Sequence, residues 1–369
     1  MNILHLEASP GWGGQEMRIL REAEGMRQRG HTVILAVMRG GGLVGKAREA
    51  GFVVYELNFH KRGWFLSLFQ LLQIFRRHRI DLVNTHSSLD SWIGGIAARL
   101  ARKTIVRTRH LSTPIKGGLN SRLLYGKLSD FVVTTCASIL PMVIEQSGKP
   151  ACRCRSIATG VDPRQIQVQG DEITAFREAL GMAPEVFLVG TACFMRSWKG
   201  VDDLLKAADL LRGVPQLKWV VIGGGHAERH KRLAAELKLE EIVTFTGHLE
   251  RPFPALAALD LFTLLSTAHE GVSQAILQAA YLGKPLLSTR IGGLSEVCVD
   301  QVTGINVSPF APQEVAEGVL RLKENKGMRE QFGESAHRLV ADRFTLNHTL
   351  DQMEEVYRHL SSKNVIRTV

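Results

Sequence analysis

The chain has 369 residues, of which 45% are hydrophobic and 22% charged, which is the composition of a globular protein long enough for two domains. Residues 1–163 hold 23 Lys and Arg against 11 Asp and Glu, a formal charge of +12, whereas residues 164–369 carry −2 of the total of +10. A basic first half predicts an anionic partner for that half. No nucleic-acid-binding signature accompanies the basic residues, so we do not expect nucleic acid as the partner.

Neither a membrane span nor a disulfide framework is predicted. The longest apolar run, residues 64–75, is interrupted by Ser67, Gln70 and Gln73 and falls short of the roughly 18 residues of a spanning helix. The N-terminus lacks a signal-peptide pattern, so we expect a cytoplasmic protein, with attachment to the inner face of the cytoplasmic membrane as a further option. The five cysteines lack CxxC spacing and are expected to be reduced thiols.

The first half alternates strands and helices, as a parallel α/β domain does. Strands are predicted at residues 1–6, 32–38, 52–57, 81–85, 104–108, 131–135 and 155–158, with helices at 16–29, 66–78 and after Ser88.

The first turn places Gly13 and Gly14 just before a helix, where bare backbone N–H groups can approach a phosphate or a sugar. A turn that merely requires glycine is the alternative. A dinucleotide cofactor is not expected, because the sixth position from Gly11 is Glu16 rather than glycine and the strand at 32–38 ends without an acidic residue.

The helix at 66–78 has apolar side chains over more of its surface than a half-buried helix needs. Basic residues flank it at Lys61, Arg62, Arg76, Arg77 and Arg79. Packing against the sheet is one interpretation. The other is that residues 61–79 contact an anionic membrane surface.

Two later strands of the first half end in basic side chains. His86 follows the strand at 81–85, and Arg109 and His110 follow the strand at 104–108. Because open parallel sheets bind ligands at the carboxyl ends of their strands, these residues are candidates for contact with substrate, against the alternative that they are structural.

Residues 159–163 are predicted to be a linker, which gives a first domain at 1–163 and a second at 164–344, with a C-terminal helix at about 345–369 packing back on the first. The second half repeats the alternation, with helices at 172–180, 202–212, 228–237 and 312–324 and strands at 186–192, 219–222, 243–246, 261–265, 286–289 and 303–307.

Residues 266–298 contain the strongest local signal for a ligand. A buried strand ends, a loop carries Glu270 and Gly271, and Ser273 is placed to cap a helix that runs to about Leu282. A helix N-terminus after such a loop is a phosphate site, and a carboxylate beside it requires a polyol or a cation. Arg196 and Lys199 lie between a strand and a helix, where their charges suit a diphosphate, although Lys199 could instead be solvated.

The order of several motifs resembles the retaining nucleotide-sugar glycosyltransferases of the family-4 type, also called glycosyl transferases group 1. These motifs are Gly13-Gly14, His110, Lys199-Gly200, Gly223-Gly224-Gly225, Phe245-Thr246-Gly247, His269-Glu270-Gly271, Gly283-Lys284-Pro285 and Gly292-Gly293-Leu294-Ser295-Glu296. The resemblance covers nearly the whole chain. It implies a GT-B fold, an α/β architecture of two Rossmann-like, doubly wound parallel-sheet domains facing across a cleft.

The resemblance also implies roles for residues. The catalytic residues would be His110, Arg196, Lys199 and Glu270. The donor nucleotide sugar would be bound by Gly13, Gly14, Gly223, Gly224, Gly247, His248, Leu249, Gly271, Val272, Ser273, Gln278 and Glu296. On the acceptor side would lie His86 and Arg109.

The chain departs from the family pattern at two places. The family has a second Glu eight positions after the first, where this chain has Gln278, and its Gly-Arg-Leu segment is replaced by Cys193-Phe194-Met195. An amide can still exchange hydrogen bonds with a ribose, so weaker or differently selective nucleotide binding is expected. Arg196 is a candidate to supply the missing guanidinium.

We therefore expect a retaining glycosyltransferase that needs neither a metal nor a cofactor, because the chain has no Asp-x-Asp and Lys199, Arg196 and a helix N-terminus would stabilise the leaving diphosphate. The expected partners are a nucleotide-diphosphate sugar and an anionic, lipid-linked glycan acceptor, such as a lipopolysaccharide core or polysaccharide intermediate. The alternatives are a transferase or epimerase acting on a small soluble substrate, and a degenerate homologue that serves as a binding subunit.

Overall fold

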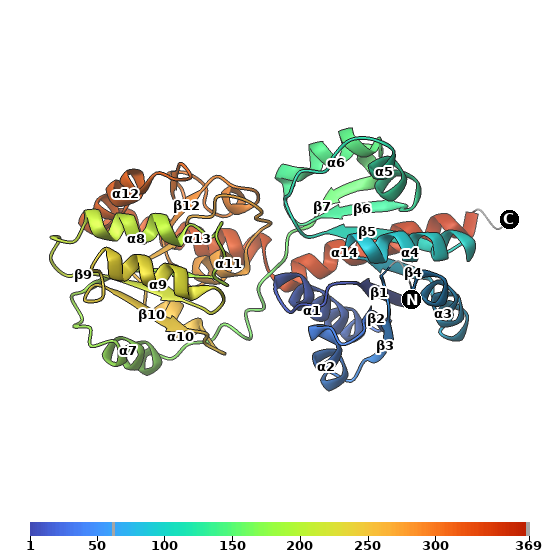
Figure 1. Ribbon diagram of the computed structural model, residues 1–369, viewed down its shortest axis with the longest axis horizontal. Helices are drawn as coiled ribbons and strands as arrows, with labels where there is room; N and C mark the ends of the chain where they lie inside the picture. The colour runs from blue at the N-terminus through green and yellow to red at the C-terminus, as the bar shows by residue number, and fades with distance from the viewer. Residues whose placement is uncertain (61–62, 367–369) are drawn as a thin grey trace. The chain divides into compact units, whose positions relative to one another are not determined.

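The computed structural model describes residues 1–60 and 63–366 (Figure 1). It divides the chain into two compact units. The first unit contains Met1–Thr159 together with the C-terminal segment that begins at Leu346, and the second contains Gly160–Thr345. The chain therefore passes from the first unit to the second and back again.

The first unit is built on a parallel sheet with the strand order β3-β2-β1-β4-β5-β6-β7 among the described residues. Its strands are β1 (Asn2–Glu7), β2 (Thr32–Met38), β3 (Val53–Leu57), β4 (Leu82–Thr85), β5 (Thr104–Arg109), β6 (Phe131–Thr134) and β7 (Cys154–Ser156). Its helices are α1 (Gly14–Gln28), α2 (Gly42–Glu49), α3 (Trp64–Arg77), α4 (Ser88–Leu100), α5 (Leu119–Ser121), α6 (Leu140–Ser147) and α14 (Leu346–Ile366), with a π-helical turn at Arg122–Lys127.

Separate apolar clusters cover the two faces of this sheet, as expected for parallel strands that are buried on both sides. The C-terminal helix α14 belongs to the first unit, where Leu350, Met353 and Tyr357 share a core with β1 and α1 (Figure 1). The fit to α1 is close, because a Cβ added at Gly25 would lie 2.3 Å from Cδ1 of Leu350. The absence of a side chain at Gly25 therefore allows α14 to pack closely against α1.

Helix α3 is only partly covered by the sheet. Leu71, Ile74 and Phe75 are buried, whereas Phe65, Leu66 and Phe69 are exposed by 89%, 62% and 58%. Arg76 and Arg77 at its C-terminal end are also exposed. Lys61 and Arg62, which complete the predicted basic flanks, lie outside the described residues.

The second unit is also a parallel α/β domain, with the strand order β10-β9-β8-β11-β12-β13 within the described part of the chain. Its strands are β8 (Phe187–Ala192), β9 (Leu217–Ile222), β10 (Val243–Gly247), β11 (Leu261–Leu264), β12 (Leu286–Thr289) and β13 (Gly304–Val307). Its helices are α7 (Gly170–Ala179), α8 (Val201–Leu210), α9 (Ala227–Glu236), α10 (Phe253–Ala257), α11 (Gln274–Tyr281), α12 (Pro312–Glu324) and α13 (Lys326–Arg343).

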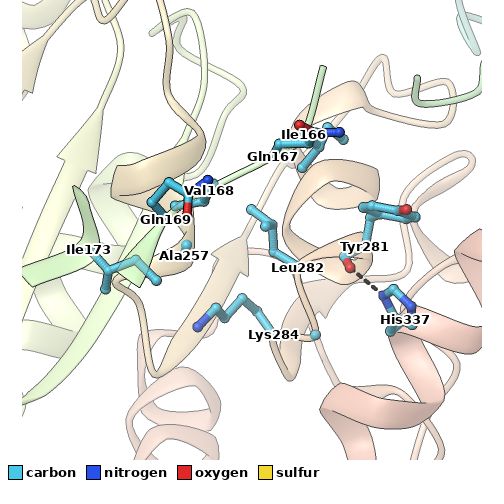
Figure 2. A pocket seen from close by; sticks show the side chains of 11 residues that line it. Ile166, Gln167, Val168, Gln169, Ile173, Ala257, Tyr281, Leu282, Lys284 and His337 are labelled. Atoms are coloured by element: carbon cyan, nitrogen blue, oxygen red, sulfur yellow. Dashed lines mark hydrogen bonds between the residues drawn. The ribbon is translucent and has the colours of Figure 1, made fainter. Parts of the chain in front are cut away.

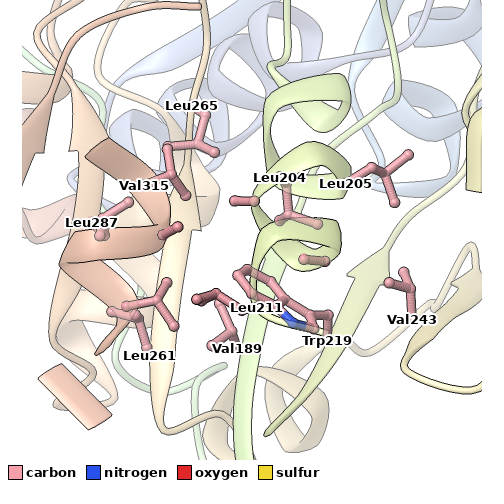
Figure 3. Close-up of a cluster of buried hydrophobic side chains, with 14 of the residues drawn as sticks. Val189, Leu204, Leu205, Leu211, Trp219, Val243, Leu261, Leu265, Leu287 and Val315 are labelled. Carbon is pink, nitrogen blue, oxygen red and sulfur yellow. The ribbon is translucent and has the colours of Figure 1, made fainter. Parts of the chain in front are cut away.

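The main core of the second unit lies where α8 packs on the central strands (Figure 3). Leu204 and Leu205 of α8 face Val189 of β8 and Trp219 of β9, and all four are no more than 1% exposed. Truncating one of these leucines to alanine would cost about 2–5 kcal/mol of folding stability. This core fixes the strand ends from which the functional loops extend.

The predicted fold class of two doubly wound parallel-sheet domains is confirmed. In each sheet the strand order reverses at one point, between β1 and β4 in the first unit and between β8 and β11 in the second. Ligands of open α/β sheets bind outside the carboxyl ends of the strands at such a reversal. None of the described helices is both long enough and apolar enough to cross a membrane.

Candidate active site

An ion pair spans the strand reversal of the second sheet. Nζ of Lys199, in the loop after β8, lies 2.5 Å from Oε1 of Glu270, in the loop after β11. Ser266 donates a hydrogen bond from Oγ to the same carboxylate oxygen at 2.6 Å. The Lys199 and Glu270 side chains are 17% and 6% exposed, so the two charges are largely removed from water and hold each other in place.

The backbone around Lys199 locks the two loops together. Gly200 has a φ of +70°, and a Cβ at this position would lie 1.9 Å from the carbonyl oxygen of Leu265. The backbone N–H of Thr267 donates to the carbonyl of Trp198 at 2.8 Å. Only glycine satisfies both the left-handed conformation and the close approach, so the Lys199-Gly200 pair follows from the contact between the loops.

Arg196 lies in the same loop as Lys199, and its backbone carbonyl accepts the N–H of Lys199 at 3.0 Å. Its guanidinium stacks on the rings of Phe194 and Trp198, at 5.3 and 5.2 Å from their centroids. Arg196 is exposed, and its guanidinium forms no ion pair or hydrogen bond with any described residue. Stacking leaves the N–H groups of a guanidinium available, so Arg196 is held at the strand ends with its donors unused.

The glycine turn after β9 packs directly against the loop after β8. A Cβ at Gly223, whose φ is +129°, would lie 2.0 Å from the carbonyl oxygen of Cys193. Gly224 accepts a hydrogen bond from the N–H of Met195 at 2.8 Å, and the N–H of Gly223 donates to the carbonyl of Gly247 at 2.9 Å. The ends of β8, β9 and β10 are therefore joined by backbone hydrogen bonds, and the exposed His248 and half-buried Leu249 follow directly.

Helix α11 begins where the sequence predicts, with Ser273 at the N-cap, although the Ser273 side chain makes no capping hydrogen bond. The preceding residues Gly271 and Val272 pack against Gly293, where a Cβ would lie 2.7 Å from the N of Val272. Gln278 is half-buried one turn into α11, and Glu296 lies in a short 3-10 turn after Gly293.

In the first unit, Gly13 is the N-cap of α1 and Gly14 is its first residue. Glu7, at the end of β1, holds this loop. Its carboxylate accepts hydrogen bonds from the N–H of Ser9 at 2.6 Å and from the amide of Gln15 at 2.5 Å. Burial, and then the nearby Asp90, raise the pKa of Glu7 to about 8.

The remaining predicted residues of the first unit are held by other side chains. Both ring nitrogens of the buried His86 lie 2.9 Å from other histidines, one from His5 and the other from His110. Arg109 donates to the hydroxyl of Tyr125 at 2.7 Å and to Thr113, and burial lowers its pKa. His86 therefore has no ring nitrogen left for a ligand. The half-buried His110 has one, because no described residue hydrogen-bonds to its Nδ1.

Sequence reasoning missed the contributions of four residues. His5, buried in the apolar strand β1, could have been recognised as a polar residue on a strand buried on both faces. Ser266 gave no signal as the partner of Glu270, and the stacking of Phe194 and Trp198 on Arg196 depends on side-chain directions that a loop sequence does not encode.

Among the described residues, acidic side chains do not form a cluster that could hold a metal ion. No cluster of three or more His, Cys, Asp or Glu side chains suited to a metal occurs in the described chain. Asp202 lies 2.6 Å from Arg229 and 2.8 Å from His230, and Asp203 accepts the N–H of Phe310 at 3.0 Å. All five cysteines are free thiols.

A cavity of about 630 Å³ lies apart from these loops, lined by residues 166–169, α7 and the C-terminal end of α11 (Figure 2). Lys284 projects into it, and His337 hydrogen-bonds to the carbonyl of Tyr281 (Figure 2). None of the predicted site residues lines this cavity, so the strand-end loops remain the candidate active site.

Two doubly wound parallel sheets, with glycine-rich loops and paired charges at the strand ends, define a GT-B protein. Comparison with known proteins agrees. The model described as Glycosyltransferase Family 4 matches residues 12–165, and the model described as Glycosyl transferases group 1 matches residues 173–339. The chain belongs to the group 1 glycosyltransferases, as its motifs indicated, and is a glycosyltransferase.

Individual relatives are distant. The chain is 25% identical over 309 residues to the uncharacterized glycosyltransferase MJ1069 of Methanocaldococcus jannaschii, covering 78% of this chain and 77% of that one. It is 27% identical over 208 residues to O-antigen chain mannosyltransferase C of Escherichia coli, covering 55% and 54% of the two chains. Among solved structures, Anabaena Alr3699/HepE in complex with UDP and glucose matches with a TM-score of 0.85 at 23% identity, over 97% of this chain and 100% of that one.

Proposed function

We propose that the chain transfers a sugar, with retention and without a metal ion, from a nucleotide diphosphate to an anionic, lipid-linked glycan acceptor. The observation that carries the proposal is the Lys199–Glu270 pair at the reversal of the second sheet, with the unpaired guanidinium of Arg196 beside it. Two cations and one carboxylate at one set of strand ends suit a diphosphate joined to a sugar.

In this mechanism the bond between the sugar C1 and the diphosphate oxygen breaks while the acceptor oxygen bonds to C1 on the same face. The acceptor proton moves to an oxygen of the departing phosphate, so no separate base is needed. Lys199 and Arg196 stabilise the charge that develops on the diphosphate, each contributing on the order of 1–3 kcal/mol. Glu270 stabilises positive charge that develops on the sugar ring.

The side chains also support a reaction without a metal ion. Asp202 and Asp203, the nearest adjacent carboxylates, are engaged by Arg229, His230 and the backbone of Phe310. Two cations, Lys199 and Arg196, lie at these strand ends against the single carboxylate of Glu270, and this excess of positive charge disfavours a divalent ion. Lys199 and Arg196 thus supply the charge that a metal would otherwise bring to the diphosphate.

A panel of UDP-, GDP- and ADP-sugars, with and without EDTA, tests this function. We expect release of one nucleotide that is insensitive to EDTA and lost in Lys199→Ala. Activity abolished by EDTA would contradict metal independence, and inactivity with every donor would favour a binding subunit. The anomeric configuration of the product, read by NMR, tests retention.

The acceptor proposal draws on the first unit and on one relative. Residues 1–163 carry a charge of +12. The relative from Escherichia coli is named for the O-antigen chain, a glycan. A basic surface recruits anionic acceptors, and a lipid-linked acceptor requires the enzyme to reach a membrane.

Helix α3 supplies a surface for that contact. Phe65, Leu66 and Phe69 are exposed in its first two turns, and Arg76 and Arg77 are exposed in its last turn. Aromatic and aliphatic side chains beside guanidinium groups suit the boundary between acyl chains and anionic headgroups. The protein would then work at the inner face of the cytoplasmic membrane.

Co-sedimentation with vesicles containing anionic lipid tests this surface. Phe65→Ser combined with Phe69→Ser should reduce binding by at least about tenfold, because burying each phenylalanine ring in the membrane contributes on the order of 1–3 kcal/mol to the free energy of binding. Phe310→Ser is a matched control, since Phe310 is 75% exposed in the second unit. Equal binding of the wild type, the double variant and Phe310→Ser would contradict the proposal that α3 contacts the membrane.

A further inference from the structure

Three histidine rings form a chain across the strand reversal of the first sheet. Nδ1 of His5, on β1, lies 2.9 Å from Nε2 of His86, which follows β4. Nδ1 of His86 lies 2.9 Å from Nε2 of His110, which follows β5. The rings of His5 and His86 are nearly coplanar, at 9° to each other, as an in-plane hydrogen bond between imidazoles requires.

Burial makes neutral rings the stable form throughout this chain. Desolvation lowers the pKa of His5 and lowers the pKa values of His86 and His110 well below the ordinary value, with Arg18 and Arg107 adding to the effect at the latter two. A neutral imidazole has one N–H and one lone pair. Two successive hydrogen bonds therefore form only if all three N–H groups point the same way along the chain.

The surrounding charges select the direction. Glu22 acts on His5 at the inner end of the chain, whereas Arg18 and Arg107 act on His86 and His110. Oε1 of Glu22 accepts from the hydroxyl of Tyr357 at 2.6 Å, and Oε2 forms an ion pair with Nε of Arg18 at 3.9 Å. Neither Oε2 of Glu22 nor Nε2 of His5 has a hydrogen-bond partner among the described residues. The N–H end of an imidazole is its positive end, so N–H groups directed toward Glu22 and lone pairs directed away from it give the lower electrostatic energy.

We propose that His5 and His86 are positioning residues that hold His110 as its Nε2–H tautomer, so that the lone pair on Nδ1 accepts a hydrogen bond from a sugar hydroxyl. In this arrangement Nε2–H of His110 donates to His86, and Nε2–H of His86 donates to His5. The arrangement excludes a phosphate oxygen as the partner of His110, because two acceptors would face each other. The identity of the ligand as a sugar rests on the proposed function, whereas the proton arrangement does not.

The tautomer can be measured directly on the full chain. Long-range proton–nitrogen correlation spectra of protein labelled with 15N-histidine distinguish a protonated from an unprotonated ring nitrogen, and His110→Gln assigns the signals. At pH 7.5 we expect His110 to be protonated at Nε2 and unprotonated at Nδ1. A proton on Nδ1 would overturn the proposal, whatever the outcome of the nucleotide-sugar panel.

Variants of His86 test the coupling. His86→Phe removes both links while retaining a ring, so the His110 signals should shift to a mixture of tautomers, and kcat/KM for the donor should fall by up to about tenfold. His86→Gln offers a carbonyl to His110 and an N–H to His5, and it should restore the single tautomer and most of the activity. A His86→Phe protein that keeps the wild-type His110 signals would show that the chain does not set the tautomer.

If no nucleotide sugar is turned over by any of these proteins, the proposed function fails while the spectra still decide the proton arrangement. A thermal melt of each variant separates loss of fold from loss of coupling. We expect His86→Phe and His86→Gln to have similar melting temperatures but different His110 spectra.

Discussion

The two sheets reverse their strand order in the same way, yet they place opposite chemistry at the reversal. In the second unit an ion pair, Lys199 with Glu270, spans β8 and β11. In the first unit a chain of neutral histidines spans β1 and β4, and Glu7 at the end of β1 has a pKa raised to about 8. The same topology therefore supports an ion pair at the reversal in one unit and neutral rings at the reversal in the other.

The difference matches the ligand that we propose for each site. A diphosphate carries charge and requires fixed cations, a role that we propose for Lys199 and Arg196. Hydroxyl groups require directional neutral partners, and an imidazole with one lone pair exposed is such a partner. Three of the four changes below remove a charged group or its support from the second unit, and one removes an ionisable group from the first.

Lys199→Ala should have the largest effect. It removes the Lys199 cation from the second reversal and leaves the Glu270 carboxylate, 6% exposed, with Ser266 as its one hydrogen-bond partner among the described residues. We expect the rate of sugar transfer to fall about 100- to 1,000-fold, the range seen when one donor to a developing anion is removed. Lys206→Ala, at an exposed position on α8, is the matched control and should retain full activity.

Glu270→Gln would leave Lys199 without its counter-charge while keeping an acceptor for Ser266. We expect kcat to fall on the order of 10- to 100-fold with little change in nucleotide affinity, because the lost charge acts on the sugar in the transition state. Steady-state kinetics with the active donor measures both. An unchanged kcat with a raised KM would instead place Glu270 in ground-state binding.

Glu7→Gln should remove a pH dependence of stability from the first unit. With an unfolded pKa of about 4.5 and a folded pKa of about 8, the folded protein holds a proton that the unfolded chain releases between these values, so wild-type stability falls as pH rises through this window. The Tm of the variant should therefore equal or trail that of wild type near pH 4.5 and exceed it by several degrees at pH 9. A difference in Tm that is constant with pH would show that Glu7 is ionised in the folded state.

Phe194→Ala should have the smallest effect. It removes one of the two rings on which Arg196 stacks, at 5.3 Å, and leaves Trp198 in place. A stacking contact at an exposed site contributes about 0.5–1 kcal/mol, so calorimetry with the bound nucleoside diphosphate should show affinity reduced about two- to fivefold. Arg196→Ala should reduce it further. Equal nucleotide affinities of the wild type and Phe194→Ala would mean that the Phe194 ring does not position the Arg196 guanidinium.

The sequence predicted the fold because its strands and glycine turns are local signals. The helix after Ser273, the strand before Glu270 and the turn at Gly223 all lie where their residue patterns place them. Short elements such as α2 and α6, eight residues each, were missed because so few residues give little periodicity.

The candidate site was only partly predictable. Lys199 and Glu270 were named from their loops, but their contact joins residues 71 positions apart and depends on the adjacency of β8 and β11. His5 could not be linked to His86 and His110 before the strand order was known. Side-chain partners across a sheet thus depend on topology, whereas individual strand ends depend on the local sequence.

The return of the chain to the first unit has a consequence for its synthesis. Helix α14 supplies Leu350, Met353 and Tyr357 to the core that contains β1, and Tyr357 also donates to the buried Glu22. A ribosome adding roughly 5–20 residues per second reaches α14 roughly 10–40 s after it leaves residue 159. We therefore expect the second unit, which is continuous in sequence, to fold first. The first unit, although synthesised earlier, should complete its core only after α14 has been synthesised. Limited proteolysis of chains stalled after residue 345 would show a protected second unit and a cleavable first one.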